Sequence, residues 1–274
     1  MEITDLKFMQ GYIRMCSDGW LQGWHERNGG NLTYRMTEQE ATAAWPFFGP
    51  PREWVKMDVQ AQNLAGEYFV TTGSGKYLRN VVLNPAANIG IVEINAAGDS
   101  FRIVWGLENG AKPTSEFPTH FLNHSVRKES TNGINRIIYH CHATNVIVLT
   151  YLLPLTDRDF TRALWQSATE CPVVFPAGVS VVPWMVPGGR EIALATSEKM
   201  KTYDAAVWAH HGLFVSGPDF DTAFGLAHTI EKSAEIYVKV LSAGQGKILQ
   251  TITDDNLRAI AHNFGVTLNE AFLD

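Results

Sequence analysis

The chain has 274 residues, of which 45% are hydrophobic and 18% charged, a balance typical of a globular protein with a sizeable core. The formal net charge of -6 argues against a nucleic-acid partner, because binding that polyanion favours a basic surface. The three cysteines have no disulfide spacing, and no stretch approaches the roughly 20 apolar residues of a membrane span. We therefore expect a cytoplasmic protein without membrane contact.

The apolar residues, taken in chain order, predict a layered α/β domain. A helix is expected at 3–23, and a strand at 29–35 is entered through a glycine turn. Residues 36–66, rich in proline and glycine from residue 45 onward, are expected to form an irregular surface excursion. The strands predicted after it lie at 67–72, 89–94, 101–106, 136–139, 173–186 and 205–208. The predicted helices lie at 118–128, 190–202 and 222–241. No internal repeat or long linker divides the chain, so we expect a single domain over 1–274.

A His-x-His pattern at the end of a predicted strand suggests a metal site. Because strand side chains alternate, His140 and His142 face one side and Cys141 faces the core. A catalytic zinc usually takes three protein ligands and keeps one position open. His211, which follows another strand and precedes a glycine, is the best third candidate, and His210 is its competitor. The alternative is that the histidines are merely hydrogen-bonded core residues.

Two carboxylates are candidates for acid–base chemistry. Glu116 lies at a helix entry, where Thr114 or Ser115 could cap the helix, and partial burial there would raise its pKa toward values useful in a general base. Glu170 lies between small residues and an apolar run. A purely structural role is an alternative for both.

Two glycine-rich segments, 27–31 and 71–76, could each hold an anion, because glycines allow the main-chain amides to approach it closely. Each could also be only a turn. The second segment is not a P-loop: Gly75-Lys76 is followed by Tyr77, and there is no glycine at position 70. Nucleoside triphosphate binding is therefore excluded.

Eight segments of the chain resemble the class II aldolase and adducin superfamily, and within it the rhamnulose-1-phosphate aldolases. They are GWHERNGGNLT (23–33), GSGK (73–76), NPAAN (84–88), PTSE (113–116), HCHATN (140–145), TEC (169–171), PWMVPG (183–188) and HG (211–212). The resemblance extends over nearly the whole chain and is weakest in 36–66. It implies an α/β/α fold around a largely antiparallel sheet, and a cyclic homotetramer with active sites at the subunit borders.

The resemblance also implies a set of site residues and a reaction. One zinc ion per subunit would be held by His140, His142 and His211, with Glu116 as the acid–base residue. For Glu170, our own expectation from the reaction is that it steers the aldehyde half of the substrate. The implied phosphate ligands are Asn28, Gly30, Asn31, Ser74, Gly75 and Ser115. The implied reaction, part of L-rhamnose degradation, cleaves the sugar phosphate L-rhamnulose 1-phosphate to dihydroxyacetone phosphate and L-lactaldehyde.

Relatives on the same scaffold leave alternatives open. Fuculose-phosphate aldolases differ in stereochemistry, pentulose-phosphate 4-epimerases rebind the aldehyde after rotation, and dehydratases lose water. A non-enzymatic module of the adducin kind would not need the three histidines.

Overall fold

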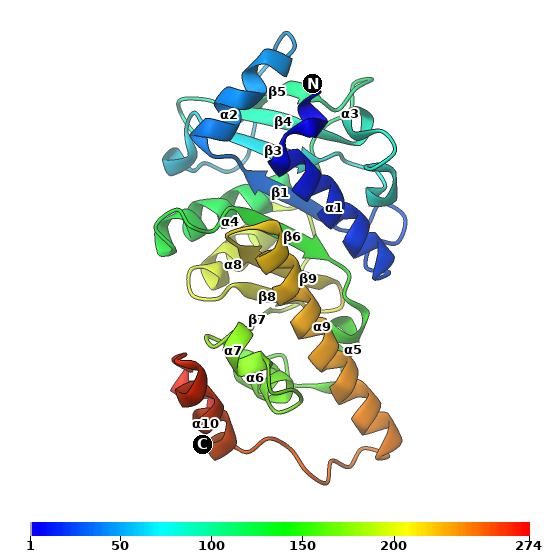
Figure 1. The fold of residues 1–274 in the computed structure, drawn as a ribbon, viewed down its shortest axis with the longest axis vertical. Coiled ribbons are helices and arrows are strands. Elements are labelled where there is room, and N and C mark those ends of the chain that lie inside the picture. The colour runs from blue at the N-terminus through cyan, green and yellow to red at the C-terminus, as the bar shows by residue number, and fades with distance from the viewer. Residues whose placement is uncertain (1) are drawn as a thin grey trace.

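The computed structural model describes residues 2–274, and within that range one sheet of nine strands runs through the molecule (Figure 1). The strands lie in the order β2-β5-β4-β3-β1-β6-β9-β8-β7, and every neighbouring pair is antiparallel except β7 and β8. Their bounds are β1 (Asn31–Arg35), β2 (Val55–Lys56), β3 (Tyr68–Thr72), β4 (Ile89–Ile94), β5 (Ser100–Gly106), β6 (Ile137–Cys141), β7 (Ser180–Val182), β8 (Ala205–Trp208) and β9 (Gly212–Gly217).

Helices cover both faces of this sheet. One face packs against α1 (Lys7–Leu21), α5 (Thr144–Leu152) and α9 (Phe220–Ala243), and the other against α4 (Phe117–Ser130) and α8 (Arg190–Met200). The remaining helices are α2 (Glu38–Ala44), α3 (Pro85–Asn88), α6 (Asp157–Trp165), α7 (Cys171–Val174) and α10 (Asp254–Phe264). The last three pack together at one end of the molecule (Figure 1). The predicted α/β/α fold with a largely antiparallel sheet is confirmed.

Side-chain alternation along β6 divides its residues between the two faces. Ile137, Tyr139 and Cys141 join the core beneath α1 and α9, whereas Ile138 joins the core beneath α8. His140, on the second side, stacks on Phe214 with ring centroids 4.3 Å apart. The strand thus points His140 away from Cys141, as the alternation predicts.

One predicted strand is largely wrong. Of residues 173–186, only β7 is a strand, and α7 overlaps the start of the segment. Pro172 lies in the first turn of α7, where its missing N–H would have had no helical partner. Gly178, with φ of 88°, then turns the chain into β7.

Several elements carry no prediction from the sequence. Residues 36–66 contain α2, which opens with a capping box between Thr37 and Glu40, and the two-residue strand β2, which pairs with β5. Nothing was predicted at α5, α6, β9 or α10. The sequence of α5, TNVIVLTYL, is apolar all round and rich in β-branched residues, so it has no helical period.

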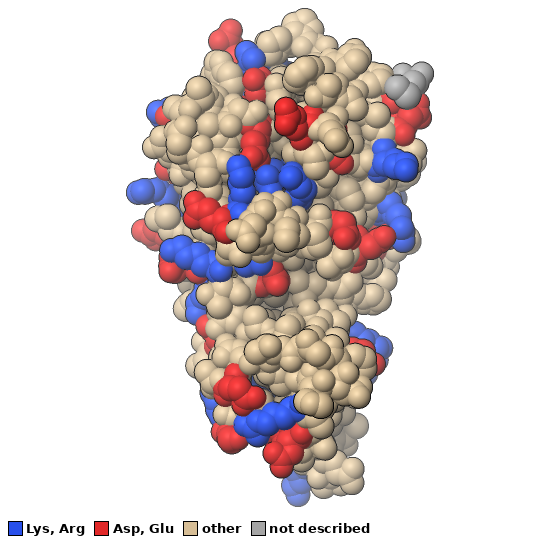
Figure 2. Space-filling model, turned by 60° about the vertical axis from the view of Figure 1, so that its left-hand side comes forward, with Lys and Arg blue, Asp and Glu red and all other residues tan. Residues whose placement is uncertain are grey.

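The surface mixes charges of both signs. On the face in Figure 2, Lys and Arg side chains are interspersed with Asp and Glu and separated by wide uncharged areas. No helix within residues 2–274 has both the length and the apolar character that crossing a membrane requires.

Candidate metal centre

His140 lies near the end of β6 and is fully buried. In the sheet it pairs with Asn31 of β1 on one side and with Phe214 of β9 on the other. Its Nδ1 lies 3.2 Å from the carbonyl oxygen of Leu213. An N–H must donate to that oxygen, so Nδ1 carries the proton and Nε2 is left bare for a metal.

His142 follows the strand and is oriented from outside it. Its backbone N–H donates to the carbonyl of Trp24 at 3.0 Å, and its Nδ1 lies 2.6 Å from Oε1 of Glu26. A carboxylate on one ring nitrogen is a common support for a metal-binding histidine, because it holds the ring and its tautomer. A Cβ on Gly29 would lie 2.7 Å from Cε1 of His142, so glycine is required for this close approach.

His211 comes from the tight connection between β8 and β9, where Trp208 pairs with Gly212. His210, with φ of 60°, takes the left-handed conformation in that turn. As a result the two neighbouring rings point to different places. The Nδ1 of His210 lies 3.1 Å from the hydroxyl of Thr150, whereas the ring of His211 lies 4.9 Å from that of His140.

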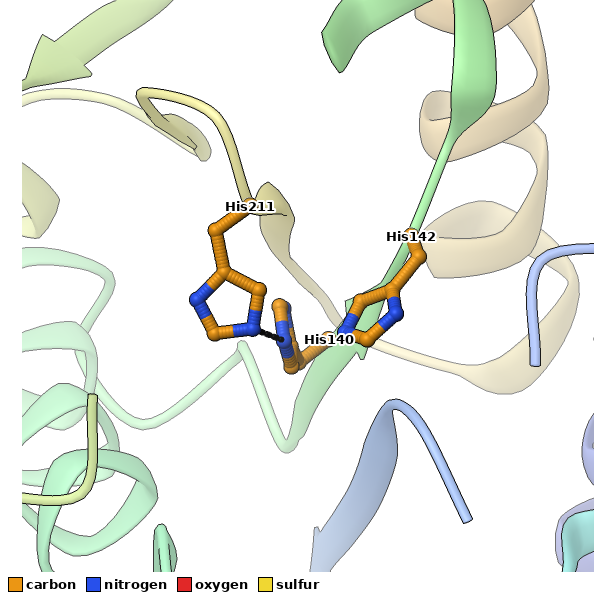
Figure 3. Close-up of side chains that lie close together, drawn as sticks. All are labelled: His140, His142 and His211. Carbon is orange, nitrogen blue, oxygen red and sulfur yellow. Dashed lines mark hydrogen bonds between the residues drawn. The ribbon is translucent and has the colours of Figure 1, made fainter. Parts of the chain in front are cut away.

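The three imidazoles converge on one point (Figure 3). One nitrogen of each of His140, His142 and His211 lies within 4.8 Å of the others, and Nε2 of His140 and of His211 are 3.4 Å apart. Burial and the two neighbouring histidines keep the pKa of His140 well below its ordinary value, and burial lowers the pKa of His211 to about 4. Both are therefore neutral at pH 7, the form that binds metals, and the donor set fits a metal ion with three protein ligands.

Glu116 stands beside this cluster at the N-cap of α4 and is only 8% exposed. Its Oε2 lies 3.8 Å from Nε2 of His140 and accepts a hydrogen bond from Nδ2 of Asn31 at 2.7 Å. Burial raises the pKa of Glu116, partly offset by the Asn31 hydrogen bond and by His142. Neither Thr114 nor Ser115 caps α4: the N-cap residue is Glu116, no side chain caps the helix, and the Thr114 hydroxyl accepts only from the Glu116 amide, at 3.3 Å.

The two glycine-rich segments lie near the histidines because of the strand pairing. β1 lies between β3 and β6 and is antiparallel to both, so its start, residues 28–31, lies at the same edge of the sheet as the loop after β3 and the end of β6 that carries His140. That loop also meets the entry to α4, since Gly73 bridges to Pro113 and the Ser74 amide donates to Lys112.

The six predicted phosphate ligands occupy different settings within these loops. Asn28, Ser74, Gly75 and Ser115 are exposed, whereas Gly30 and Asn31 are buried. Gly30 has φ of 70°, and a Cβ there would lie 2.7 Å from the His140 carbonyl oxygen, so it serves the turn into β1. The Asn31 amide is already engaged with Glu116 on one side and with His120 on the other.

Glu170 lies on the surface of the chain, outside the histidine cluster. It is exposed at the N-cap of α7, where it lines an open pocket of about 490 Å³ with His228 and Lys232 of α9. Within residues 2–274 it makes no hydrogen bond or ion pair with the three histidines.

Sequence reasoning missed four side chains that support the site. Glu26 holds His142, and His25 bridges the Gly29 carbonyl and the Tyr139 hydroxyl at 3.0 and 2.7 Å. Both lie in the segment 23–33, and the resemblance of that segment to the family was the signal that could have identified them. Thr33 ends that same segment, whereas His120, behind Asn31, stands in no motif, and only the fold reveals it.

Comparison with known proteins shows the family to which the chain belongs. The family model described as "Class II Aldolase and Adducin N-terminal domain" matches residues 10–238. Two curated relatives, both named rhamnulose-1-phosphate aldolase, come from Escherichia coli O157:H7 and Klebsiella pneumoniae. The first is 49% identical over 97% of this chain and 96% of its own length, and the second 50% identical over 99% and 98%.

Solved structures share the fold. A sugar-phosphate aldolase from Thermotoga maritima has 29% identity and a TM-score of 0.71 over 85% of this chain and 94% of its own. An L-fuculose 1-phosphate aldolase has 20% identity and a TM-score of 0.60 over 93% and 95%, a likeness of fold alone. With the family match over most of its length and close relatives over nearly all of it, the chain belongs to the class II aldolase and adducin family.

Proposed function

We propose that this protein is a metal-dependent aldolase of L-rhamnose degradation that cleaves L-rhamnulose 1-phosphate to dihydroxyacetone phosphate and L-lactaldehyde. The observation that carries the proposal is the placement of a buried carboxylate, Glu116, 3.8 Å from Nε2 of a three-histidine cluster. The named relatives, close to half identical over nearly the full chain, supply the substrate.

The metal in this proposal is zinc, one ion per subunit, with His140, His142 and His211 as its ligands. Three neutral imidazoles suit zinc and leave a coordination position open. When bound, the ion supplies Lewis-acid stabilisation of the negative charge that develops on the oxygens of the dihydroxyacetone half. The second nitrogens of His140 and His142 already face a carbonyl and a carboxylate, which hold both rings in position.

Glu116 moves the proton. Breaking the C3–C4 bond requires loss of the proton on the C4 hydroxyl as the aldehyde forms, and the electron pair stays on C3 as an enediolate. C3 must then gain a proton to give dihydroxyacetone phosphate. One carboxylate can take the first proton and return one to C3. Glu116 is suited to this because burial raises its pKa toward the working pH.

The phosphate is held, in this proposal, by Asn28, Gly30, Asn31, Ser74, Gly75 and Ser115. Hydroxyls, side-chain amides and backbone N–H groups in adjoining loops can surround a phosphate without a basic side chain among them. These contacts lie away from the bond that breaks, so they position the substrate for the reaction. Substituting Ser74 by Ala should raise KM for the sugar phosphate with little change in kcat, and binding should depend only moderately on salt.

We further propose that the protein is a single-domain cytoplasmic homotetramer. The run 183–186 supports a subunit contact, because Trp184 and Val186 are 62% and 70% exposed. The unpaired state of all three cysteines, which are buried, supports a reducing compartment. Glu170 is proposed to steer the aldehyde half. Because Glu170 makes no hydrogen bond or ion pair with the three histidines within residues 2–274, we propose that it acts at the site of a neighbouring subunit.

The test is to incubate purified protein containing zinc with rhamnulose 1-phosphate and, separately, with fuculose 1-phosphate. The expected products are dihydroxyacetone phosphate and L-lactaldehyde from the first sugar, formed much faster than any product from the second. A diastereomeric sugar phosphate as product would indicate an epimerase, and a product that has lost water would indicate a dehydratase. Preference for fuculose 1-phosphate would reassign the stereochemistry.

A further inference from the structure

A hydrogen-bonded row of buried polar side chains, which we call the file, leads to Glu116 from the interior. Nε2 of His124 and Nδ1 of His120 each lie 2.8 Å from the hydroxyl of Thr33. Nε2 of His120 contacts Oδ1 of Asn31, and Nδ2 of Asn31 lies 2.7 Å from Oε2 of Glu116. The side chains behind Glu116 are all at most 7% exposed: His124, Thr33, His120 and Asn31. The file joins α4 to β1 across the face of the sheet.

The chemistry of these groups gives the file one direction. The Glu116 carboxylate can only accept, so the Asn31 amide donates to it and turns its oxygen toward His120. His120 must then donate from Nε2, which leaves Nδ1 to accept from the Thr33 hydroxyl. The Thr33 oxygen in turn accepts from Nε2–H of His124. All four hydrogen bonds thus donate toward Glu116, an order in which each bond polarises the next.

The neutral state of the histidines is consistent with this order. Burial lowers the pKa of His120 to about 3 and holds the pKa of His124 well below its ordinary value. Each ring therefore has one N–H at pH 7, the number that the file requires. The ring of His120 also packs against Phe214, on which His140 stacks. Phe214 therefore contacts both the file and the metal centre.

The geometry of the carboxylate shows what this arrangement does. Only Oε2 is held by the file, and this same atom lies 3.8 Å from Nε2 of His140. Oε1 makes no hydrogen bond with any residue in the range 2–274, so it remains available to a substrate. The Asn31 oxygen and one N–H are committed to the file, which leaves its second N–H for the phosphate.

We propose that Asn31 and His120 are positioning residues for Glu116: the file holds one carboxylate oxygen against the metal centre so that the other meets the reacting carbon. This inference rests on the proposed function and adds a task that differs from phosphate binding. His120 separates the two roles, since it reaches Glu116 only through Asn31 and lies in none of the phosphate loops.

The experiment compares His120→Leu, which removes the donor, with His120→Gln, whose amide can donate to Asn31 from a similar position. Asn123→Ala is the matched control, because Asn123 is fully buried in α4 but has no hydrogen-bond partner within residues 2–274. Two rates are measured on the zinc-loaded proteins. One is cleavage of rhamnulose 1-phosphate, and the other is exchange of a carbon-bound hydrogen of dihydroxyacetone phosphate with heavy water, followed by NMR. The exchange needs proton transfer but no aldehyde.

For His120→Leu we expect kcat of both reactions to fall by about 10–100-fold, the usual effect of losing a residue that supports a catalytic group. KM should stay within about threefold, and zinc content should be unchanged. His120→Gln should recover most of the loss, and Asn123→Ala should keep wild-type rates. If His120→Leu does not fold, Thr33→Val and Thr33→Ser provide the same comparison at the next hydrogen bond of the file: Val removes the hydroxyl that donates to His120, and Ser keeps it.

A kcat for His120→Leu within about twofold of wild type would overturn the proposal, as would a loss that His120→Gln fails to recover. Asn31→Leu gives a second refutation: a raised KM with unchanged kcat would make Asn31 a phosphate ligand only. A wild-type protein that exchanges hydrogen but does not cleave this sugar phosphate would refute the proposed substrate, while the exchange rates of the variants still decide the role of the file. A wild type with neither activity would overturn both.

Discussion

The sharpest prediction concerns Glu116→Gln. Glutamine keeps the shape of the side chain, and its carbonyl oxygen can still accept the hydrogen bond that Asn31 donates at 2.7 Å. It cannot take up a proton at any working pH. Because general acid–base residues typically contribute about 10²–10⁴-fold, turnover should fall by that range. Zinc content and affinity for dihydroxyacetone phosphate should hardly change, since the three histidines and the phosphate loops are untouched.

The same substitution should not destabilise the metal-free protein at neutral pH. Burial raises the pKa of Glu116 above its ordinary value of 4.5, so the folded state holds this proton more tightly than the unfolded state does. Its contribution to stability is therefore fully present below about pH 4.5 and is lost as the pH rises through the folded-state pKa. At pH 8 the wild type keeps a costly buried charge that glutamine lacks.

Melting temperature and kcat, measured together at pH 8 and at pH 4.5, test the reasoning. We expect the metal-free variant to melt at or above the wild type at pH 8, with the difference shrinking in acid. A carboxylate that merely supported the start of α4 would give the opposite result, a lower melting temperature with nearly normal kcat per folded molecule. Cleavage within a few-fold of wild type would remove Glu116 from the acid–base role and make Glu170 the next candidate.

Three further predictions follow from the geometry. His142→Ala should lose most of its zinc in elemental analysis, because two protein ligands hold zinc poorly, whereas His210→Ala should keep it; full zinc in the first variant would refute the ligand set. Glu231 of α9 accepts from the amides of Asn145 and Val146 at 2.9 and 3.0 Å, so it caps α5 directly after the segment that carries His140 and His142. Glu231→Gln should lower the free energy of unfolding in urea by about 1.5–3 kcal/mol, and an unchanged value would show that the cap is dispensable. His120, with a pKa lowered to about 3 by burial, contributes stability that is present above about pH 6.5 and lost as the pH falls toward 3. The wild type should therefore lose about 1.4 kcal/mol more per pH unit between pH 6 and 4 than His120→Gln does, and parallel stability curves would contradict a neutral buried His120.

Local patterns in the sequence determined much of the secondary structure and the direction in which strand side chains point. The alternation along residues 137–141 predicted which way His140 and Cys141 point, because the period of a strand depends only on the backbone. Helices with an apolar stripe, such as α1, α4 and α9, were found within a few residues of their ends. The predicted strand over 173–186 failed because Pro172, just before it, lies in the first turn of a helix that overlaps its start, and Gly178 makes a turn within it.

Only the tertiary structure decided how the distant groups meet. The choice of His211 over His210 depends on which of two adjacent residues takes the left-handed position in the β8–β9 turn. The partners of Asn31 lie 85 and 89 positions away in the sequence, so no local pattern could reveal that its amide joins Glu116 to His120. The pKa of Glu116 depends on burial beneath segments that are remote in the chain. Sequence periodicity is a property of neighbours, whereas hydrogen bonding and desolvation depend on which elements pack together.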